Sequence, residues 1–390
     1  MIDMERKKTF NLQLMITEEC NLRCTYCFEI DKGSRQMPID IAKEILDREL
    51  SQPGDYDEYQ IDLAGGEPFL HFESLQEIIN YGVNNASRWG KRFFFFICSN
   101  LTLLTPEIKK WLEETKDYVI LGTSLDGSKE AHDHYRCNSY DAVVSNIPFY
   151  KQTYPKQGVK MTISSDTVGE IFEGIKKIEG MGLTLSANVV YEPVWGDKLT
   201  KRNHLIKFAE QLDLLIQHYI ENPELEIPSI LSLPISLIDA PHNPEHRWCG
   251  SGLTMRCYDT DGRPLPCHRF SFFSTNKIYE GKQSIGQRII TKCDDCKFID
   301  ACPTCPGYNW QVNGHPESRT SFHCEFIKLQ LLAIAKLKYM QNKSLVSDLV
   351  NGKPKKPLNT SLEYVDTLLD LQASYLIMHT LDVDKILSNI

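Results

Sequence analysis

Three cysteines in the stretch TEECNLRCTYCFE, residues 17–29, could together hold a metal centre: Cys20, Cys24 and Cys27. Zinc and most iron–sulfur clusters take four protein ligands, so a loop with three thiolates leaves one coordination position open. An open position keeps a metal site chemically active. The alternative is a zinc or electron-transfer centre that a cysteine elsewhere in the chain completes.

Eight more cysteines lie in the C-terminal half of the chain. They are Cys249, Cys257, Cys267, Cys293, Cys296, Cys302, Cys305 and Cys324. Two closed four-iron clusters need eight thiolates, so this region has enough ligands for both without using the first loop. A zinc ribbon is the alternative, because the CDDC and CPTC spacings also suit zinc.

Two of the thirteen cysteines remain outside these groups. Cys98 ends an apolar run, where a buried cysteine behaves as a small hydrophobic residue. Cys137 directly follows Arg136, and a redox or substrate-binding role is an open alternative for it.

The composition excludes several classes of protein. The chain has 390 residues and a net charge of −9, which disfavours nucleic-acid binding because that requires a concentrated basic face. The N-terminus lacks the apolar segment of a secretory signal, and the run FFFFIC at 93–98 is too short to cross a membrane. The basic run KPKKP at 353–357 predicts a solvated linker. An odd number of thiols without an export signal indicates a reducing compartment, so we expect a cytoplasmic protein.

Short apolar runs alternate with amphipathic segments in the first half of the chain. Six runs predict strands, at 11–16, 58–64, 92–98, 118–125, 159–164 and 183–191. Five amphipathic segments predict helices, at 37–50, 73–86, 105–115, 140–152 and 167–181. Thr105 followed by Pro106 predicts a helix start, and Gly180 with Gly182 predicts a helix end.

This alternation predicts an α/β fold with a parallel sheet, because parallel neighbours need a crossover helix. Six strand–helix units are too few for a closed eightfold barrel, so we expect an open, partial (β/α)6 barrel of the TIM type. The run FFFFIC predicts a strand covered on both faces. Ligands of such sheets bind at the carboxyl ends of the strands, and the three-cysteine loop follows the first strand at that end.

The cysteine spacing, the aromatic Tyr26 and Phe28 beside it and the six strand–helix units resemble the radical S-adenosylmethionine (SAM) superfamily, over residues 10–190. The resemblance implies that the three cysteines hold a four-iron cluster and that SAM occupies its open iron through amino and carboxylate groups. It also implies that the reduced cluster cleaves SAM to methionine and a 5′-deoxyadenosyl radical, which abstracts hydrogen from the substrate.

The resemblance places cofactor contacts at the ends of the later strands. AGGEP at 64–68 is similar to the motif that binds the SAM amino group, through Gly65, Gly66 and Glu67. Ser124 and Arg136 would hold the methionine carboxylate. Asp126 would shape the turn or contact the substrate, which makes it a candidate catalytic residue. The remaining implied SAM contacts are Tyr26, Ser99, Asn100 and Asn188.

His132 and His134 lie in the same segment, SLDGSKEAHDHYR, and could be read as a metal-binding pair. The segment resembles a common block of the superfamily, so we expect both histidines to belong to a helix instead.

The C-terminal cysteines and the stretch DGRPLPCHRF, residues 261–270, resemble the SPASM extension of radical SAM enzymes, which binds two auxiliary four-iron clusters. One interval departs from the pattern, because two residues rather than three separate Cys302 from Cys305. The implied ligand sets are Cys249, Cys257, Cys267 and Cys305 for one cluster, and Cys293, Cys296, Cys302 and Cys324 for the other.

The chain is therefore predicted to contain four parts. They are a radical SAM partial barrel over 1–200, a helix and linker over 201–246, a SPASM auxiliary-cluster domain over 247–330 and C-terminal helices over 331–390. The predicted cofactors are SAM and three four-iron clusters.

Enzymes with a SPASM region mostly modify ribosomally made peptides or proteins. Among them the chain resembles peptide maturases and, less closely, anaerobic sulfatase-maturing enzymes, in which an aspartate after the hairpin cysteine acts as base. Here His268 follows Cys267 and is the candidate base. We expect a precursor peptide to gain a thioether or another crosslink. The alternatives are formylglycine formation in a sulfatase, a small-molecule dehydrogenase, and an electron carrier that makes no use of SAM.

The expected partners are the precursor peptide and an electron donor such as flavodoxin or ferredoxin, with no nucleic acid or membrane. About ten residues precede the first predicted strand, too few for a winged-helix leader-binding domain. We therefore expect a separate protein or the C-terminal helices to recognise any leader.

Overall fold

The computed structural model describes residues 8–341, except 53, 239–242, 244–245, 282–284, 286–288, 290, 292 and 297. The predicted linker at 353–357 and most of the predicted C-terminal helices lie outside the described residues.

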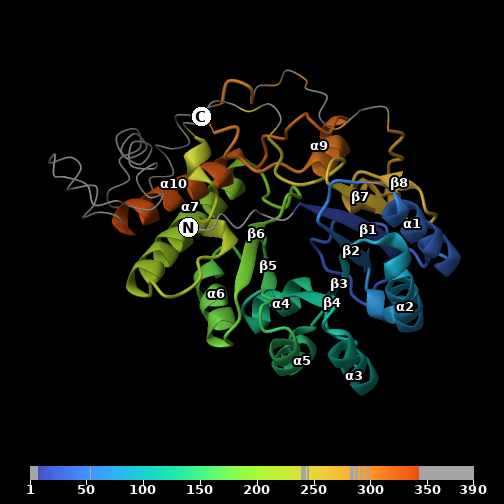
Figure 1. Ribbon diagram of the computed structural model, residues 1–390. Helices are drawn as coiled ribbons and strands as arrows, with labels where there is room; N and C mark the ends of the chain where they lie inside the picture. The colour runs from blue at the N-terminus through green and yellow to red at the C-terminus, as the bar shows by residue number, and fades with distance from the viewer. Residues whose placement is uncertain are drawn as a thin grey trace, which may run out of the picture.

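Eight strands form one curved sheet in the order β6-β5-β4-β3-β2-β1-β7-β8 (Figure 1). Every neighbouring pair is parallel except β7 and β8. The strands are β1 (Thr9–Thr17), β2 (Glu58–Gly65), β3 (Phe93–Ser99), β4 (Val119–Ser124), β5 (Val159–Ile163), β6 (Leu185–Val189), β7 (Met255–Tyr258) and β8 (Pro264–Leu265). The six predicted strands and the α/β partial barrel are confirmed.

The helices between these strands lie outside the curve of the sheet (Figure 1). They are α1 (Ile39–Ser51), α2 (Phe72–Trp89), α3 (Pro106–Thr115), α4 (Lys129–Tyr135), α5 (Tyr140–Thr153) and α6 (Ile171–Gly180). The predicted start of α3 is confirmed, because the Thr105 hydroxyl accepts a hydrogen bond from the Ile108 N–H at 3.2 Å. The predicted end of α6 is also confirmed, with Gly182 at φ +68°.

Alternation along each strand separates an apolar outer face from a polar inner face. The outward side chains of β5 are buried, and a Cβ on Gly174 of α6 would lie 2.9 Å from the Met161 Cε. Inward side chains are half-buried or exposed on several strands: Asn11, Gln60, Asp62, Lys160, Thr162, Ser186 and Asn188. The inner face is therefore the side of the sheet that can accept polar ligands.

The prediction that FFFFIC forms a strand covered on both faces is wrong. Phe95 and Ile97 are fully buried under the outer helices, whereas Phe96 is half-buried and Cys98 is exposed. Cys98 faces inward beside Gly122 of β4, which has no side chain to cover it. Its interpretation as a buried small hydrophobic residue is wrong for the same reason.

The cysteine-rich region continues the barrel sheet, which the sequence did not predict. Residues Asn11 to Leu14 of β1 pair in parallel with Met255 to Tyr258 of β7, and β8 completes an antiparallel hairpin. On the opposite side, the long helix α7 (Lys198–Glu221) packs against α10 (Cys324–Gln341). The ring centres of Trp195 and Phe326 lie 4.3 Å apart.

The other elements are α8 (Phe272–Thr275), α9 (Pro306–Asn313) and the 3₁₀ turns η1 (Pro68–His71), η2 (Ser229–Leu231), η3 (Ile235–Leu237) and η4 (His268–Phe270). Within the described part of the chain, no helix is both long enough and apolar enough to cross a membrane.

Candidate functional site

The three-cysteine loop leaves the carboxyl end of β1 and is held against the end of β2. The Gly66 N–H donates to the Thr17 carbonyl at 3.1 Å, and the Glu67 N–H donates to the Glu19 carbonyl at 2.8 Å. A Cβ on Gly66 would overlap the Glu19 carbonyl and lie 2.8 Å from the Cys20 Cβ. The glycine pair is thus required where the strand end meets the cysteine loop, as well as being the predicted cofactor contact.

The three thiols of this loop lie close enough to influence one another. Burial raises the pKa of Cys20 and Cys27 and raises that of Cys24 to about 11, while the Lys32 ammonium opposes the rise in each case. The neighbouring thiols raise the pKa of Cys24 further, since three thiolates repel one another. A positively charged iron centre would relieve that repulsion, and its binding would release the thiol protons. The donor set therefore fits the predicted cluster.

Glu67 joins the ends of β2 and β3 through its buried carboxylate. It accepts hydrogen bonds from the Ser99 hydroxyl at 2.8 Å, the Asn100 N–H at 2.7 Å and the Phe69 N–H at 3.2 Å. Burial raises the pKa of this carboxyl to about 7, against the effect of these donors. The Asn100 side chain donates to the side-chain Oδ1 of Asn21 at 2.9 Å and so reaches the cysteine loop. Contacts from Glu67, Ser99 and Asn100 to SAM remain predictions.

Asp126 is the centre of a buried network at the end of β4. Its carboxylate accepts from Arg136 Nε at 2.6 Å and from the Thr162 N–H at 2.9 Å, and the Tyr26 hydroxyl also donates to it. The Arg136 guanidinium lies 5.4 Å from the centre of the Tyr26 ring. Burial opposes the charge on Arg136, but Asp126 raises the pKa of this group above its usual value. Asp126 thereby positions Arg136 and Tyr26. The side chain of Asp126 is fully buried, so neither carboxylate oxygen is open to a substrate, and its catalytic role stays a prediction.

Helix α4 places its two histidines in different environments. His132 is buried, and its Nδ1 accepts from the Asp126 N–H at 3.3 Å. His134 is exposed and lies 3.2 Å from the Asp166 carboxylate. The two imidazoles thus belong to a helix, as expected, and do not form a metal-binding pair.

Cys137 lies against the cysteine loop. Its Sγ accepts a hydrogen bond from the Arg23 N–H at 3.2 Å, and Arg23 stands between two of the loop cysteines. Its backbone is left-handed, with φ +57°.

Two of the predicted cofactor contacts, Ser124 and Asn188, lie on the inner face of the sheet. Ser124 ends β4 and is half-buried, while Asn188 on β6 is exposed and donates to the Ser186 hydroxyl at 3.0 Å.

His268 faces the barrel through a polar chain that the sequence did not predict. Its Nδ1 lies 3.0 Å from Gln13 Oε1, and Gln13 Nε2 donates to the Asp62 carboxylate at 3.3 Å. Since a carboxylate can only accept, the amide oxygen of Gln13 faces the imidazole and Nδ1 carries the hydrogen. Burial, aided by the charges of Lys160 and Arg269, lowers the pKa of His268 to about 4. Neutral His268 therefore keeps a free lone pair on Nε2.

Arg269 joins the cysteine loop to the auxiliary region and was also missed. Its guanidinium lies 4.8 Å from the Phe28 ring centre and 5.3 Å from that of Tyr308. It pairs with Glu192, beyond β6, at 2.6 Å and donates to Gln311 of α9 at 3.0 Å. A buried cation thus holds three segments of the site together.

The first predicted set of auxiliary ligands lies together in the structure. Burial raises the pKa of Cys267 to about 12, and the thiols of Cys305 and Cys249 contribute to the rise. Burial raises the pKa of Cys257 well above its ordinary value, and the Cys267 thiol adds to the rise. The set includes Cys305, despite the departure from the usual spacing.

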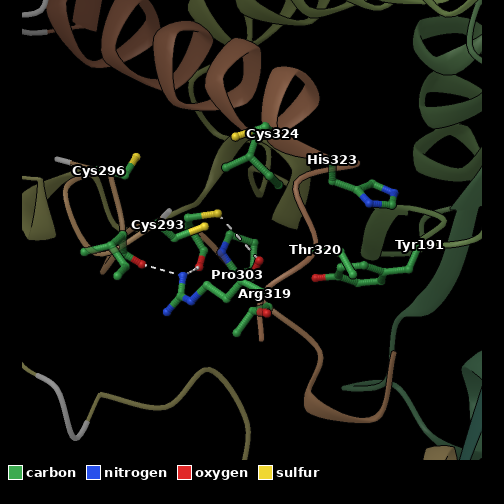
Figure 2. A pocket seen from close by; sticks show the side chains of 12 residues that line it. Tyr191, Cys293, Cys296, Pro303, Arg319, Thr320, His323 and Cys324 are labelled. Carbon is green, nitrogen blue, oxygen red and sulfur yellow. Dashed lines mark hydrogen bonds between the residues drawn. The ribbon is translucent and has the colours of Figure 1, made fainter. Parts of the chain in front are cut away.

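The second set lines one cavity beside the start of α10 (Figure 2). Its cysteines are Cys293, Cys296, Cys302 and Cys324. Burial raises the pKa of Cys302 to about 12; the Arg319 guanidinium opposes this, and the other three thiols of the set add to it. Arg319 also donates to the Cys302 carbonyl at 3.1 Å, so a cation lies beside the four thiols.

The donor arrangement also bears on the zinc alternative. Across the described ranges, no three cysteine, histidine, aspartate or glutamate side chains converge closely enough to hold a single metal ion. Zinc requires four ligands around one ion at bond lengths of about 2.0–2.3 Å, whereas a cluster distributes its thiolates over four irons. The cluster and zinc interpretations of the C-terminal cysteines both stay predictions.

Part of the chain is similar to a known protein family. Residues 14–191 match the family model of the radical SAM superfamily. A cysteine-type anaerobic sulfatase-maturating enzyme of Clostridium novyi is 27% identical over 177 residues, which cover 41% of this chain and 46% of that protein.

Two solved structures share the fold at lower sequence identity. The structure of native anSMEcpe with bound AdoMet and Cp18Cys peptide matches with a TM-score of 0.65 at 17% identity, over 88% of this chain and 99% of that chain. Streptococcus suis SuiB bound to precursor peptide SuiA matches with a TM-score of 0.57 at 16% identity, over 81% of this chain and 76% of that chain.

Proposed function

From the radical SAM domain that residues 14–191 form, we propose that this protein cleaves SAM and modifies a ribosomally made precursor peptide, by forming a thioether or another crosslink. The observation that carries the proposal is the grouping of thiols into one set of three at the end of β1 and two sets of four in the C-terminal region. A set of three leaves an iron for SAM, and two sets of four can bind closed auxiliary clusters.

When bound, the reduced cluster with SAM supplies a 5′-deoxyadenosyl radical, which abstracts a hydrogen atom from the substrate. Cys20, Cys24 and Cys27 would hold the cluster, with Lys32 offsetting their negative charge. Ser124, Asn188 and the Gly65–Gly66 pair would surround SAM on the inner face. Asp126 would keep Arg136 and Tyr26 in place at the same end of the sheet.

His268 would act as the base that accepts a proton from the substrate. Its Nε2 lone pair is available because Gln13 fixes the hydrogen on Nδ1. The imidazole is neutral at pH 7 and can accept a proton, but with a pKa of about 4 it is a weak base, since general bases work best with a pKa near the operating pH. The resemblance gives sulfatase-maturing enzymes an aspartate at this position, so His268 favours a peptide maturase.

Sulfatase maturation is the second candidate. The similarity to the sulfatase-maturating enzyme of Clostridium novyi and the higher TM-score for anSMEcpe than for SuiB favour it. Both candidates share a peptide substrate, which is supported by the peptides bound in the two solved structures. We further propose a cytoplasmic location, reduction by flavodoxin or ferredoxin and, for a leader peptide, a separate binding protein.

The first test is SAM cleavage by anaerobically reconstituted, reduced protein, measured as 5′-deoxyadenosine by liquid chromatography and mass spectrometry. A fully loaded protein that forms none is no radical SAM enzyme. The second test offers a Cys-containing sulfatase peptide and a precursor peptide encoded beside the gene. Loss of hydrogen from the precursor supports crosslinking, whereas conversion of Cys to formylglycine in the sulfatase peptide supports the second candidate.

A further inference from the structure

Lys160 is a cation on the inner face of the sheet. Its neighbours Val159 and Met161 are buried on the outer face, whereas the Lys160 side chain is exposed on the opposite face. Lys160 lies opposite Ser124 in the pairing of β4 with β5 and opposite Ser186 in the pairing of β5 with β6. It therefore stands at the carboxyl end of β4, where the cofactor and the substrate are expected to meet.

No group in the described residues neutralises this cation. Nζ of Lys160 has neither a hydrogen bond nor an ion pair within the part of the chain that the structure describes. The inner-face carboxylate of Asp62 instead accepts from the amides of Asn11, Gln13 and Gln60. Glu67 is likewise occupied by donors at the ends of β2 and β3.

The charge of Lys160 reaches across the inner face. The Cys98 thiol on β3 is open to the interior of the barrel, yet the surrounding sheet encloses it and raises its pKa, and the charge of Lys160 opposes that rise. The carboxylates of Glu67 and Asp62 act on Cys98 in the opposite sense, so the positive field is confined to the neighbourhood of Lys160. The hydroxyl of Ser124, beside Lys160, can add a neutral donor to this field.

We propose that Lys160, together with Ser124, binds a carboxylate on the inner face of the barrel. An ammonium and a hydroxyl form charge-assisted hydrogen bonds to such a group. Arg136, the carboxylate ligand that the family resemblance implies, is already paired with Asp126 at 2.6 Å. The inference rests on the proposed function for the source of the ligand, which is either the methionine carboxylate of SAM or a carboxylate of the peptide substrate.

Cys98 offers a direct reporter of this field, because it is exposed and its pKa responds to Lys160. Iodoacetate carries a carboxylate and iodoacetamide does not, yet both alkylate the same thiolate. The ratio of their rates at Cys98 therefore measures attraction of a carboxylate and cancels changes in thiolate fraction. The rates are read by peptide mass mapping of the anaerobically reconstituted protein, in which clusters occupy the ligand cysteines.

The expected result is a preference for iodoacetate that falls about threefold or more in Lys160→Met and persists in Lys160→Arg. Lys110→Met is the control, because Lys110 is 77% exposed on α3. A Lys160→Met protein with the wild-type ratio would overturn the proposal. Since alkylation needs no SAM cleavage, this result is independent of whether the enzyme proposal holds.

Competition identifies the source of the carboxylate. If SAM removes the preference for iodoacetate while decarboxylated SAM preserves it, the ligand is the methionine carboxylate. If the preference survives saturation with SAM, the cation remains available for a carboxylate of the peptide. Either outcome supports the proposal, provided that the wild-type preference depends on Lys160.

Discussion

At the rim of the barrel, buried side chains hold one another in place through hydrogen bonds. Asp126 receives donors from Tyr26, Arg136 and the Thr162 backbone, so one carboxylate joins the cysteine loop, the segment after α4 and strand β5. The sequence placed all three side chains at this end of the sheet but assigned them separately to cofactor and substrate. Pairing of Arg136 with Asp126 could not be read from spacing, because both residues also suit a ligand.

Replacement of Asp126 by Asn should destabilise the protein strongly. The buried Arg136 guanidinium would lose its counter-charge, and breaking such a pair costs about 3–5 kcal/mol. The unfolding free energy from urea titration is the measurement. Asp141→Asn is the control, because Asp141 is 79% exposed in its pair with Lys129 and should cost at most about 1 kcal/mol. Equal effects of the two substitutions would contradict this assignment.

His132 should make stability fall in mild acid. Burial, aided by the charge of Arg136, lowers the pKa of His132 to about 4, below its ordinary 6.5. The Nδ1 of His132 accepts from the Asp126 N–H only while it is unprotonated. The unfolded chain therefore binds the proton first as pH falls, and folding stability is lost between pH 6.5 and 4. The loss is about 2 kcal/mol at pH 5 relative to pH 7.

The measurement is the difference in unfolding free energy between pH 7 and pH 5 for the wild type and His132→Asn. The substitution keeps an acceptor near Nδ1 and should reduce the pH dependence. His134→Asn, two residues away and exposed, should leave that dependence as it is in the wild type. A variant of His132 with an unchanged slope would show that another group titrates.

Two elements approach each other closely where β4 turns toward α4. Gly127 has φ +80°, and a Cβ there would lie 2.5 Å from the Gly174 Cα on α6. Gly127→Ala should therefore be more destabilising than Gly90→Ala, which has φ +62° but nothing within 4 Å of the added carbon. Both substitutions carry the cost of left-handed backbone, about 1–2 kcal/mol, but only the first adds a steric cost of about 1–3 kcal/mol.

Thermal unfolding of both variants tests this close approach. A similar loss of stability in Gly127→Ala and Gly90→Ala would show that the turn can move away from α6.

Periodicity predicted the six strands and the helices between them because each has a buried face long enough to leave a pattern. Strand β7 was missed because it has four residues and its partner β1 is distant in sequence. Gln13 and Asp62 were passed over because they lie in runs predicted as strands. Their role depends on the curvature of the sheet, which brings Gln13 within hydrogen-bond distance of His268 and of Asp62.

The molecule as a whole brings cysteines from distant parts of the sequence into three sets. The sequence predicts the cysteine sets because their order resembles that of a known family. Arg269 was not singled out, since its role arises only when Phe28, Glu192 and Gln311 come together from distant segments.

The number of irons bound per protein should depend on which set of cysteines is intact. Wild-type protein should bind about twelve irons, and Cys20/Cys24/Cys27→Ala about eight, because the auxiliary sets do not share ligands with the loop. Loss of all iron in the triple variant would mean that the sets fold as one.

Cys302→Ala should keep part of the SAM cleavage yet abolish product, whereas equal loss of both would give the auxiliary region a structural role only.

The pairing of β1 with β7 has a consequence for biosynthesis. Asn11 to Leu14 leave the ribosome early, but their partners Met255 to Tyr258 follow much later. At about 5–20 residues per second, one edge of β1 stays unpaired for roughly ten to fifty seconds. During that interval its backbone is open to strand addition by other chains, and the cysteine loop at its end is still accessible. A chain truncated before β7 would keep that edge permanently, so we expect it to aggregate while the full chain remains dispersed.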